Sequence, residues 1–243
     1  MVTTAFDGQT FDTASELIHY FEFLLGEECA RLRRCGLGPQ VALGVVPGAR
    51  PRRAHYEVWE ALAQLLQHQS AVALGEIGVW QDEKAHWELF ERQVRIAHDV
   101  GPLPLIVMPP AELKITLTYK MMTWLEKFGY PPSLVMMSGL DERLVENVVE
   151  SGFCAGIPVG SASNDPRQMG CHLHQVLDRV GGADKILLTT ALRSAGGDVL
   201  GVPKTIVSLR EAGVSDAQIG EMVYGNAARL FGQNLEEPGE EKE

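Results

Sequence analysis

The chain has 243 residues, of which 45% are hydrophobic and 22% are charged, and its formal net charge at pH 7 is -11. This length and composition are typical of a globular protein that buries a sizeable core. The negative charge argues against a nucleic-acid-binding surface spread over the whole molecule. We therefore do not expect nucleic acid to be a partner.

Cysteine spacing and apolar runs indicate the compartment. The four cysteines form no CxxC pair and match neither a zinc site nor a disulfide framework. The N-terminus lacks the basic and apolar regions of a signal peptide. No apolar run approaches the roughly 18 residues of a transmembrane helix. We expect a cytoplasmic protein with reduced thiols and no membrane association.

Apolar runs typical of strands alternate with segments of helical periodicity along the chain. The predicted strands are 1–6, 41–46, 71–78, 105–108, 134–137, 154–159 and 186–190. The predicted helices are 14–35, 57–66, 82–100 with Asp82 as N-cap, 112–128, 141–150, 167–180, one starting at Pro203 and one capped by Ser215. Residues 235–243 form an acidic tail that we expect to be disordered, which leaves 1–234 as a single barrel domain.

This alternation predicts an α/β fold. A doubly wound sheet would fit the same order, but the regular spacing favours a TIM-like (β/α) barrel. Such a barrel has eight strands, and this sequence supplies seven, with the first one missing. A missing strand leaves hydrogen-bonding groups of the sheet unpaired. We therefore expect a dimer contact or a loop to cover the gap, and a homo-oligomer is one expected partner.

Glu76 stands near the end of the predicted strand 71–78, which reads as buried on both faces. An unpaired carboxylate is costly to bury. We therefore expect Glu76 to lie at the mouth of the barrel, where α/β barrels carry their chemistry. The alternative is a relic acid satisfied by backbone donors or by a salt bridge.

Four stretches resemble the TatD-type family of metal-dependent hydrolases, which are α/β barrels. They are Gly-Glu-Ile-Gly at 75–78 with the helix 90–97, Leu-Pro-Leu-Ile-Val at 103–107, the segment 198–205, and Asn-Ala-Ala-Arg-Leu-Phe-Gly at 226–232. Their order and spacing hold over nearly the whole chain. The sequence is most similar to a branch whose fifth strand reads His-Thr-Pro with a lysine six residues past the histidine.

The resemblance implies one or two divalent metals, Zn, Mg or Mn, bound by histidines and acids at the strand ends. Glu76 matches the family acid after the fourth strand and is the one expected metal ligand. The fifth-strand histidine falls on Met108 and the lysine falls on Lys114. The sixth-strand histidine falls on Ser138 or Gly139. The eighth-strand aspartate falls within 190–193, which holds no acid, and the His-x-His of the first strand is absent.

These departures predict a TatD-like barrel protein that has lost or strongly altered its metal site and acts as a binding or interaction protein, with a small-molecule or protein ligand. The alternative is a metal-dependent hydrolase of ester or phosphodiester bonds. It would use a site rebuilt around Glu76, Lys114 and Asp198, or belong to a longer native chain whose start lies upstream of Met1. A further alternative is metal-free acid/base chemistry by Glu76 with Lys114. For Lys114 and Asp198 the competing interpretations are a solvated helix lysine and a loop or cap residue.

Overall fold

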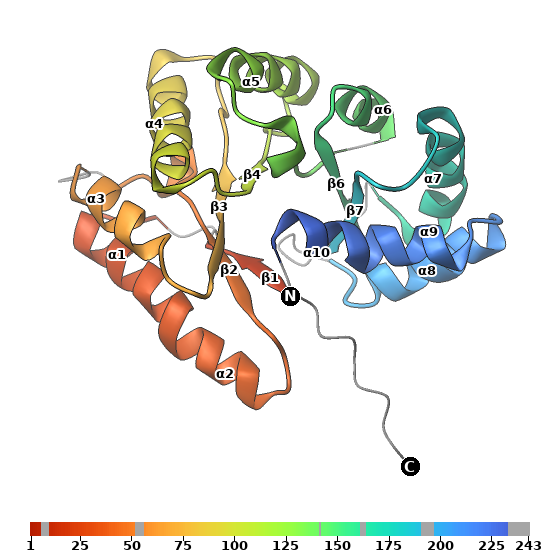
Figure 1. Cartoon of the computed structure of the whole chain (residues 1–243), viewed down its shortest axis with the longest axis horizontal. Coiled ribbons are helices and arrows are strands. Elements are labelled where there is room, and N and C mark those ends of the chain that lie inside the picture. Colours follow the sequence, from red (N-terminus) through yellow and green to blue (C-terminus); the bar gives the residue numbers. More distant parts are fainter. Residues whose placement is uncertain (6–9, 52–55, 141, 161–163, 191–196, 233–243) are drawn as a thin grey trace.

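A computed structural model describes residues 1–5, 10–51, 56–140, 142–160, 164–190 and 197–232. Its sheet is parallel, and each strand lies beside its neighbours in sequence. The strands are β1 (Val2–Thr4), β2 (Gln40–Leu43), β3 (Ala71–Ile77), β4 (Leu105–Val107), β5 (Val135–Met137), β6 (Cys154–Val159) and β7 (Ile186–Thr190). They form a curled half-barrel with helices around its outer face (Figure 1). This confirms the predicted TIM-like architecture, with seven strands among the described residues.

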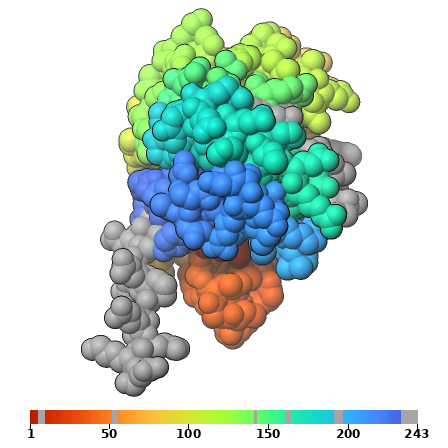
Figure 2. Space-filling model, turned by 90° about the vertical axis from the view of Figure 1, so that its right-hand side faces the viewer, coloured from red at the N-terminus to blue at the C-terminus, as the bar shows by residue number. Residues whose placement is uncertain are grey.

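Helices follow the strands in the order that the sequence predicts. They are α1 (Ala14–Phe23), α2 (Cys29–Arg34), α3 (Tyr56–Leu65), α4 (Lys84–Val100), α5 (Lys114–Phe128), α6 (Glu142–Glu150), α7 (Pro166–Val180), α8 (Gly201–Glu211), α9 (Asp216–Gly220) and α10 (Asn226–Leu230). Short π-helical turns join α1 to α2 and α9 to α10, and 3-10 turns lie at Pro47–Ala49 and Pro132–Leu134. Figure 2 shows α7, in teal, above α8, α9 and α10, in blue, on one side of the molecule.

Several predicted boundaries differ from the observed ones by a few residues, and two of the differences have a clear local cause. The strand predicted to reach Val46 ends at Leu43, because Val45 exchanges backbone hydrogen bonds with the buried side chain of Gln93. The helix predicted to be capped by Asp82 begins at Lys84. The Asp82 carboxylate instead accepts hydrogen bonds from side chains further along the chain, as described below.

The sheet has an apolar core on each face. Most buried side chains, such as Leu43 and Val107, belong to a large cluster that includes side chains of the surrounding helices. The concave face carries a smaller cluster built from Ala42, Ala73, Ile106, Met136, Cys154 and Leu187, together with Leu230 and Phe231 from the C-terminal segment. Strand residues thus alternate between the two clusters, as the period of a β-strand requires.

Helix α10 is held against the amino-terminal end of the strands. The amide of Asn226 donates hydrogen bonds to the carbonyl oxygens of Ala183, at 2.6 Å, and Ile186, at 2.7 Å. These contacts place Leu230 and Phe231 against the concave face near Val2 and Leu187, at the amino-terminal ends of β1 and β7. The C-terminal helix therefore closes the floor of the half-barrel.

The sheet has one open side. Within the described residues, β1 pairs with β2 and β7 pairs with β6, and β1 and β7 do not pair with each other. The gap lies where an eighth strand would close the barrel. At the floor of the half-barrel, α10 packs beside this gap, where the sequence predicts a loop or a dimer contact. Higher up, Thr4 is half-buried and Thr190 is exposed.

No helix in the described part of the chain combines the length and apolar composition needed to span a membrane.

Candidate functional site

The carboxyl ends of β3, β4 and β5 form the best-described part of the barrel mouth. The backbone N–H of Met108 donates to the carbonyl oxygen of Ile77 at 2.8 Å, and that of Ser138 donates to Val107 at 2.7 Å. Each bond extends the parallel ladder just beyond the strand. Glu76, Met108 and Ser138 are therefore fixed at the ends of consecutive strands by backbone that has little freedom to move.

Glu76 lies within β3 and is 7% exposed. The peptide bond that joins it to Gly75 is cis. The backbone is tightly packed around this residue, because a Cβ added to Gly75 would lie 2.5 Å from the Cβ of Ile106. A Cβ added to Gly44 on the other side would lie 2.7 Å from the carbonyl oxygen of Glu76. Gly44, just after β2, and Gly75, within β3, thus allow the close approach of the backbone on either side of Glu76.

Lys114 begins α5 and is half-buried. Its ammonium group donates a hydrogen bond of 2.8 Å to the carbonyl oxygen of Gly139, just past β5. The side chain of Met108 is close to the same glycine, since a Cβ added to Gly139 would be 3.6 Å from Met108 Cγ. A positive charge is therefore held at the carboxyl end of β5, and the described residues contain no ion pair between Lys114 and Glu76.

Asp198 lies beside the carboxyl end of β6, where its backbone N–H donates to the Gly160 carbonyl at 2.8 Å. Its carboxylate accepts hydrogen bonds from Lys204 Nζ, at 2.6 Å, and from the backbone N–H of Leu200, at 2.9 Å. The Lys204 ammonium, with the Leu200 N–H, lowers the pKa of Asp198 below its usual range. The side chain therefore stabilises the turn that leads into α8.

The three predicted site residues thus lie near the carboxyl ends of three strands, and no described contact joins any of them to another. Their joint role in one site stays a prediction. Across the described residues, no group of three or more His, Cys, Asp and Glu side chains is arranged to hold a metal ion. The His-x-His at 172–174 lies in α7, where His174 pairs with Asp178 one turn later.

Comparison with known proteins gives consistent results. A curated protein of Methanocaldococcus jannaschii, named as an uncharacterized metal-dependent hydrolase, is 24% identical over 238 residues, which is 95% of this chain and 89% of that protein. This match confirms the predicted resemblance to metal-dependent hydrolases, and the fold is that of TatD-like proteins. The crystal structure of a TatD-like protein from Archaeoglobus fulgidus superposes with a TM-score of 0.74 at 19% identity, over 96% of this chain and 88% of that one.

Two further solved structures share the fold. One is a TatD family hydrolase of Entamoeba histolytica, with a TM-score of 0.61 at 12% identity over 95% of this chain and 83% of the other. The second is a phosphotriesterase homology protein of Escherichia coli with phosphate in its active site, with a TM-score of 0.67 at 15% identity over 84% and 78%. No protein-family model matches the chain.

The relative named as a metal-dependent hydrolase raises the question of whether this mouth fits a divalent cation. Glu76 provides a suitable carboxylate. Methionine is a soft thioether ligand that Zn, Mg and Mn do not favour, and Met108 takes the place of the fifth-strand histidine. At the sixth-strand position, Ser138 and Gly139 offer no imidazole, and the Lys114 ammonium approaches Gly139 instead. The described donors therefore do not fit the family metal. Residues 191–193, part of the eighth-strand position, lie outside the description.

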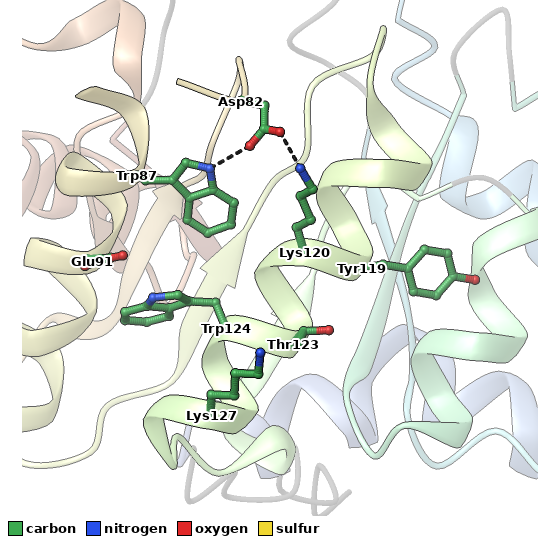
Figure 3. Close-up of a pocket in the computed structure, with 8 residues that line it drawn as sticks. All are labelled: Asp82, Trp87, Glu91, Tyr119, Lys120, Thr123, Trp124 and Lys127. Carbon is green, nitrogen blue, oxygen red and sulfur yellow. Dashed lines mark hydrogen bonds and ion pairs between the residues drawn. The ribbon is translucent and has the colours of Figure 1, made fainter. Parts of the chain in front are cut away.

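One feature of the outer surface was missed from the sequence. A groove of 480 Å³ runs between α4 and α5, and we call it the α4–α5 groove. Its lining residues are Asp82, Trp87, Glu91, Tyr119, Lys120, Thr123, Trp124 and Lys127 (Figure 3). The sequence signal is the spacing of aromatic residues by three or four positions on both helices, which by itself indicates only a buried face.

Proposed function

We propose that this chain is a TatD-like barrel protein whose family metal site is lost or strongly altered, and that it binds a ligand at the strand ends without metal-dependent hydrolysis. The hydrogen bond between Lys114 Nζ and the Gly139 carbonyl carries this proposal. It places a cation where the family has a metal-binding histidine. Like charges repel in a partly desolvated site, and with Met108, Ser138 and Gly139 at the positions of the family histidines no described metal ligand offsets that repulsion.

The same ammonium group indicates the chemistry of the ligand. Lysine has three N–H donors, and Gly139 takes one of those on Lys114. The remaining donors and the positive charge suit an anionic group, such as a carboxylate or a phosphate. Ser138, beside Gly139, is 8% exposed and adds a hydroxyl group at the same strand end. We therefore expect a small anionic ligand.

The alternative function is hydrolysis of an ester or phosphodiester bond at a rebuilt site that uses Glu76, Lys114 and Asp198. The observation that favours it is the buried acid Glu76 near the carboxyl end of β3, at a position that the resemblance matches to the family acid. The Methanocaldococcus protein named as a metal-dependent hydrolase also aligns over almost all of this chain. Both observations are compatible with either function.

One experiment separates the two functions. The protein is purified without chelator, its zinc, manganese and magnesium contents are measured, and hydrolysis of a phosphodiester is assayed. The proposal predicts substoichiometric metal and no turnover above that of a Glu76→Gln variant. One equivalent of metal per chain, together with turnover that Glu76→Gln abolishes, would show that the chain is a metal-dependent hydrolase.

A further inference from the structure

The α4–α5 groove lies on the helical layer, and none of the residues at the strand ends lines it. Aromatic rings fill its floor. Trp124 of α5 stacks on Phe128, with ring centroids 5.1 Å apart, and meets Phe90 of α4 edge to face at 5.6 Å. Phe90 in turn contacts Trp87 at 6.0 Å. Both tryptophans are only half-buried, so these rings present an apolar surface to the solvent.

Helix α5 also presents an apolar ridge beside the groove. Ile115 and Tyr119 stand one turn apart and are 46% and 39% exposed. In Figure 3, Tyr119 points away from α4, while Trp124 and Lys120 point toward α4 and the preceding loop. Thr123, a small residue, lies between the two sides. One helix therefore carries both a ridge and one wall of a groove, which is what a surface needs in order to pack against its own copy.

The charges of the groove balance, in contrast to the rest of the protein. Asp82 and Glu91 are matched by Lys120 and Lys127, whereas the whole chain carries -11. Two copies of so acidic a chain repel each other over most approaches. A locally neutral face is where that repulsion is weakest.

Two of these charges have no ionic partner within the described part of the chain. Asp82 accepts from Lys120 and from the indole N–H of Trp87, as the dashed lines of Figure 3 mark. No such contact is recorded for Glu91 of α4 or Lys127 of α5, which stand on opposite walls of the groove. In a two-fold symmetric contact the same residues meet in both directions. Glu91 of one copy can then pair with Lys127 of the other, twice.

We propose that the α4–α5 groove is the contact surface of a two-fold symmetric homodimer. The Ile115 and Tyr119 ridge of each copy packs into the aromatic groove of the other, with Thr123 near the symmetry axis. The contact is independent of the ligand site at the strand ends. It also leaves the open β1–β7 side of the sheet uncovered.

Sedimentation velocity of the full chain tests this proposal. Interfaces of standard size range widely in affinity, so loading concentrations from about 1 to 200 µM are needed. We expect the mass to rise from one chain to two. Thr123 is exposed, and arginine is a good helix former. Thr123→Arg brings two like charges together at the axis and should give a monomer throughout. Gln175→Arg, an exposed site on α7, is the matched control and should leave dimerisation unchanged.

A charge exchange distinguishes this face from any other. Glu91→Lys and Lys127→Glu should each weaken the dimer by at least tenfold, because each change opposes like charges across the contact. The double variant restores both pairs and should recover the dimer. A monomer at every concentration overturns the proposal, as does a dimer that Thr123→Arg leaves intact or one whose single charge variants dimerise normally. A monomer would leave the groove to a different partner.

Discussion

Lys114 Nζ donates a hydrogen bond of 2.8 Å to the carbonyl oxygen of Gly139 and so ties the start of α5 to the carboxyl end of β5. The family resemblance identifies the lysine, but its contact is a property of the fold. In the function that we propose, this ammonium group attracts an anionic ligand. The proposed ligand site thus combines this lysine of α5, at the carboxyl end of β5, with the buried acid Glu76 of β3.

Replacing Lys114 by methionine should reduce the binding of a small anion. Methionine keeps most of the length and apolar volume of lysine, so the main loss is the charged donor. Hydrogen bonds to charged groups contribute about 1.5–3 kcal/mol, which corresponds to a roughly ten- to hundredfold loss of affinity. Calorimetric titration with inorganic phosphate measures the change, and Lys84→Met, at a highly exposed position of α4, is the control. Equal affinities of the wild type and Lys114→Met would contradict the anion site.

The features of the site that could be predicted are those that follow from the local pattern of apolar and charged residues in the sequence. The apolar run before Glu76 is long enough to indicate a buried strand, and a carboxylate at its end then has to lie at the mouth. The partner of Lys114 could not be predicted, because Gly139 is 25 residues away and the contact depends on how α5 packs beside β5. Asp82 was misread for the same reason. Its position suits an N-cap, but Lys120, 38 residues later, competes for it.

The α4–α5 groove shows the same limit. Helical periodicity identifies Trp87, Phe90 and Trp124 as members of inward-facing stripes. Whether the side chains of such stripes are completely buried depends on the distance between the two helices. The local sequence pattern does not determine this distance. The aromatic rings span that distance while their outer edges stay accessible.

Gly75→Ala should destabilise the protein, because the added Cβ would lie 2.5 Å from the Cβ of Ile106. The strand backbone has to shift, and overpacking of this kind costs about 1–3 kcal/mol. Urea unfolding followed by circular dichroism measures the loss. Gly26→Ala, where an added Cβ meets nothing within 4 Å, is the control and should be neutral or slightly stabilising. A stable Gly75→Ala protein would mean that β3 and β4 are less closely packed here.

Asn226→Ala should release α10 from the floor of the half-barrel. The residue is 3% exposed, and its amide satisfies the carbonyl oxygens of both Ala183 and Ile186. Unpaired buried polar groups are costly, so we expect a loss of about 2–4 kcal/mol in the free energy of unfolding. The exposed Asn147→Ala on α6 is the comparison. Similar unfolding midpoints for the two variants would rule out this anchoring role.

The four cysteines should react with an alkylating agent at two distinct rates. Cys35 and Cys171 are exposed, whereas Cys29 and Cys154 are buried. Burial raises the pKa of Cys154 to about 11, and the thiolate is the reactive form. At pH 8 about one in a thousand such thiols is ionised, against roughly one in four for an ordinary cysteine. Mass spectrometry should show two rapid additions of N-ethylmaleimide, with the other two only after unfolding. Rapid labelling of Cys154 in the native protein would contradict its burial.

Asp198→Asn should lower stability in a pH-dependent way. Lys204 and the Leu200 N–H lower the pKa of Asp198 in the folded protein, while the unfolded value is about 3.9. A lowered folded pKa contributes stability that is complete above the unfolded value and is lost as pH falls through the folded value. The difference in unfolding free energy between the wild type and Asp198→Asn should therefore be constant from about pH 5 to 8 and shrink below about pH 4. Because the pair is exposed, added salt should weaken this difference as well.

Urea unfolding at each pH measures this difference in unfolding free energy, with Glu60→Gln on α3 as the control for loss of an exposed carboxylate. A difference that grows as the pH falls would reverse the expected sign and show that Asp198 is not stabilised as an anion.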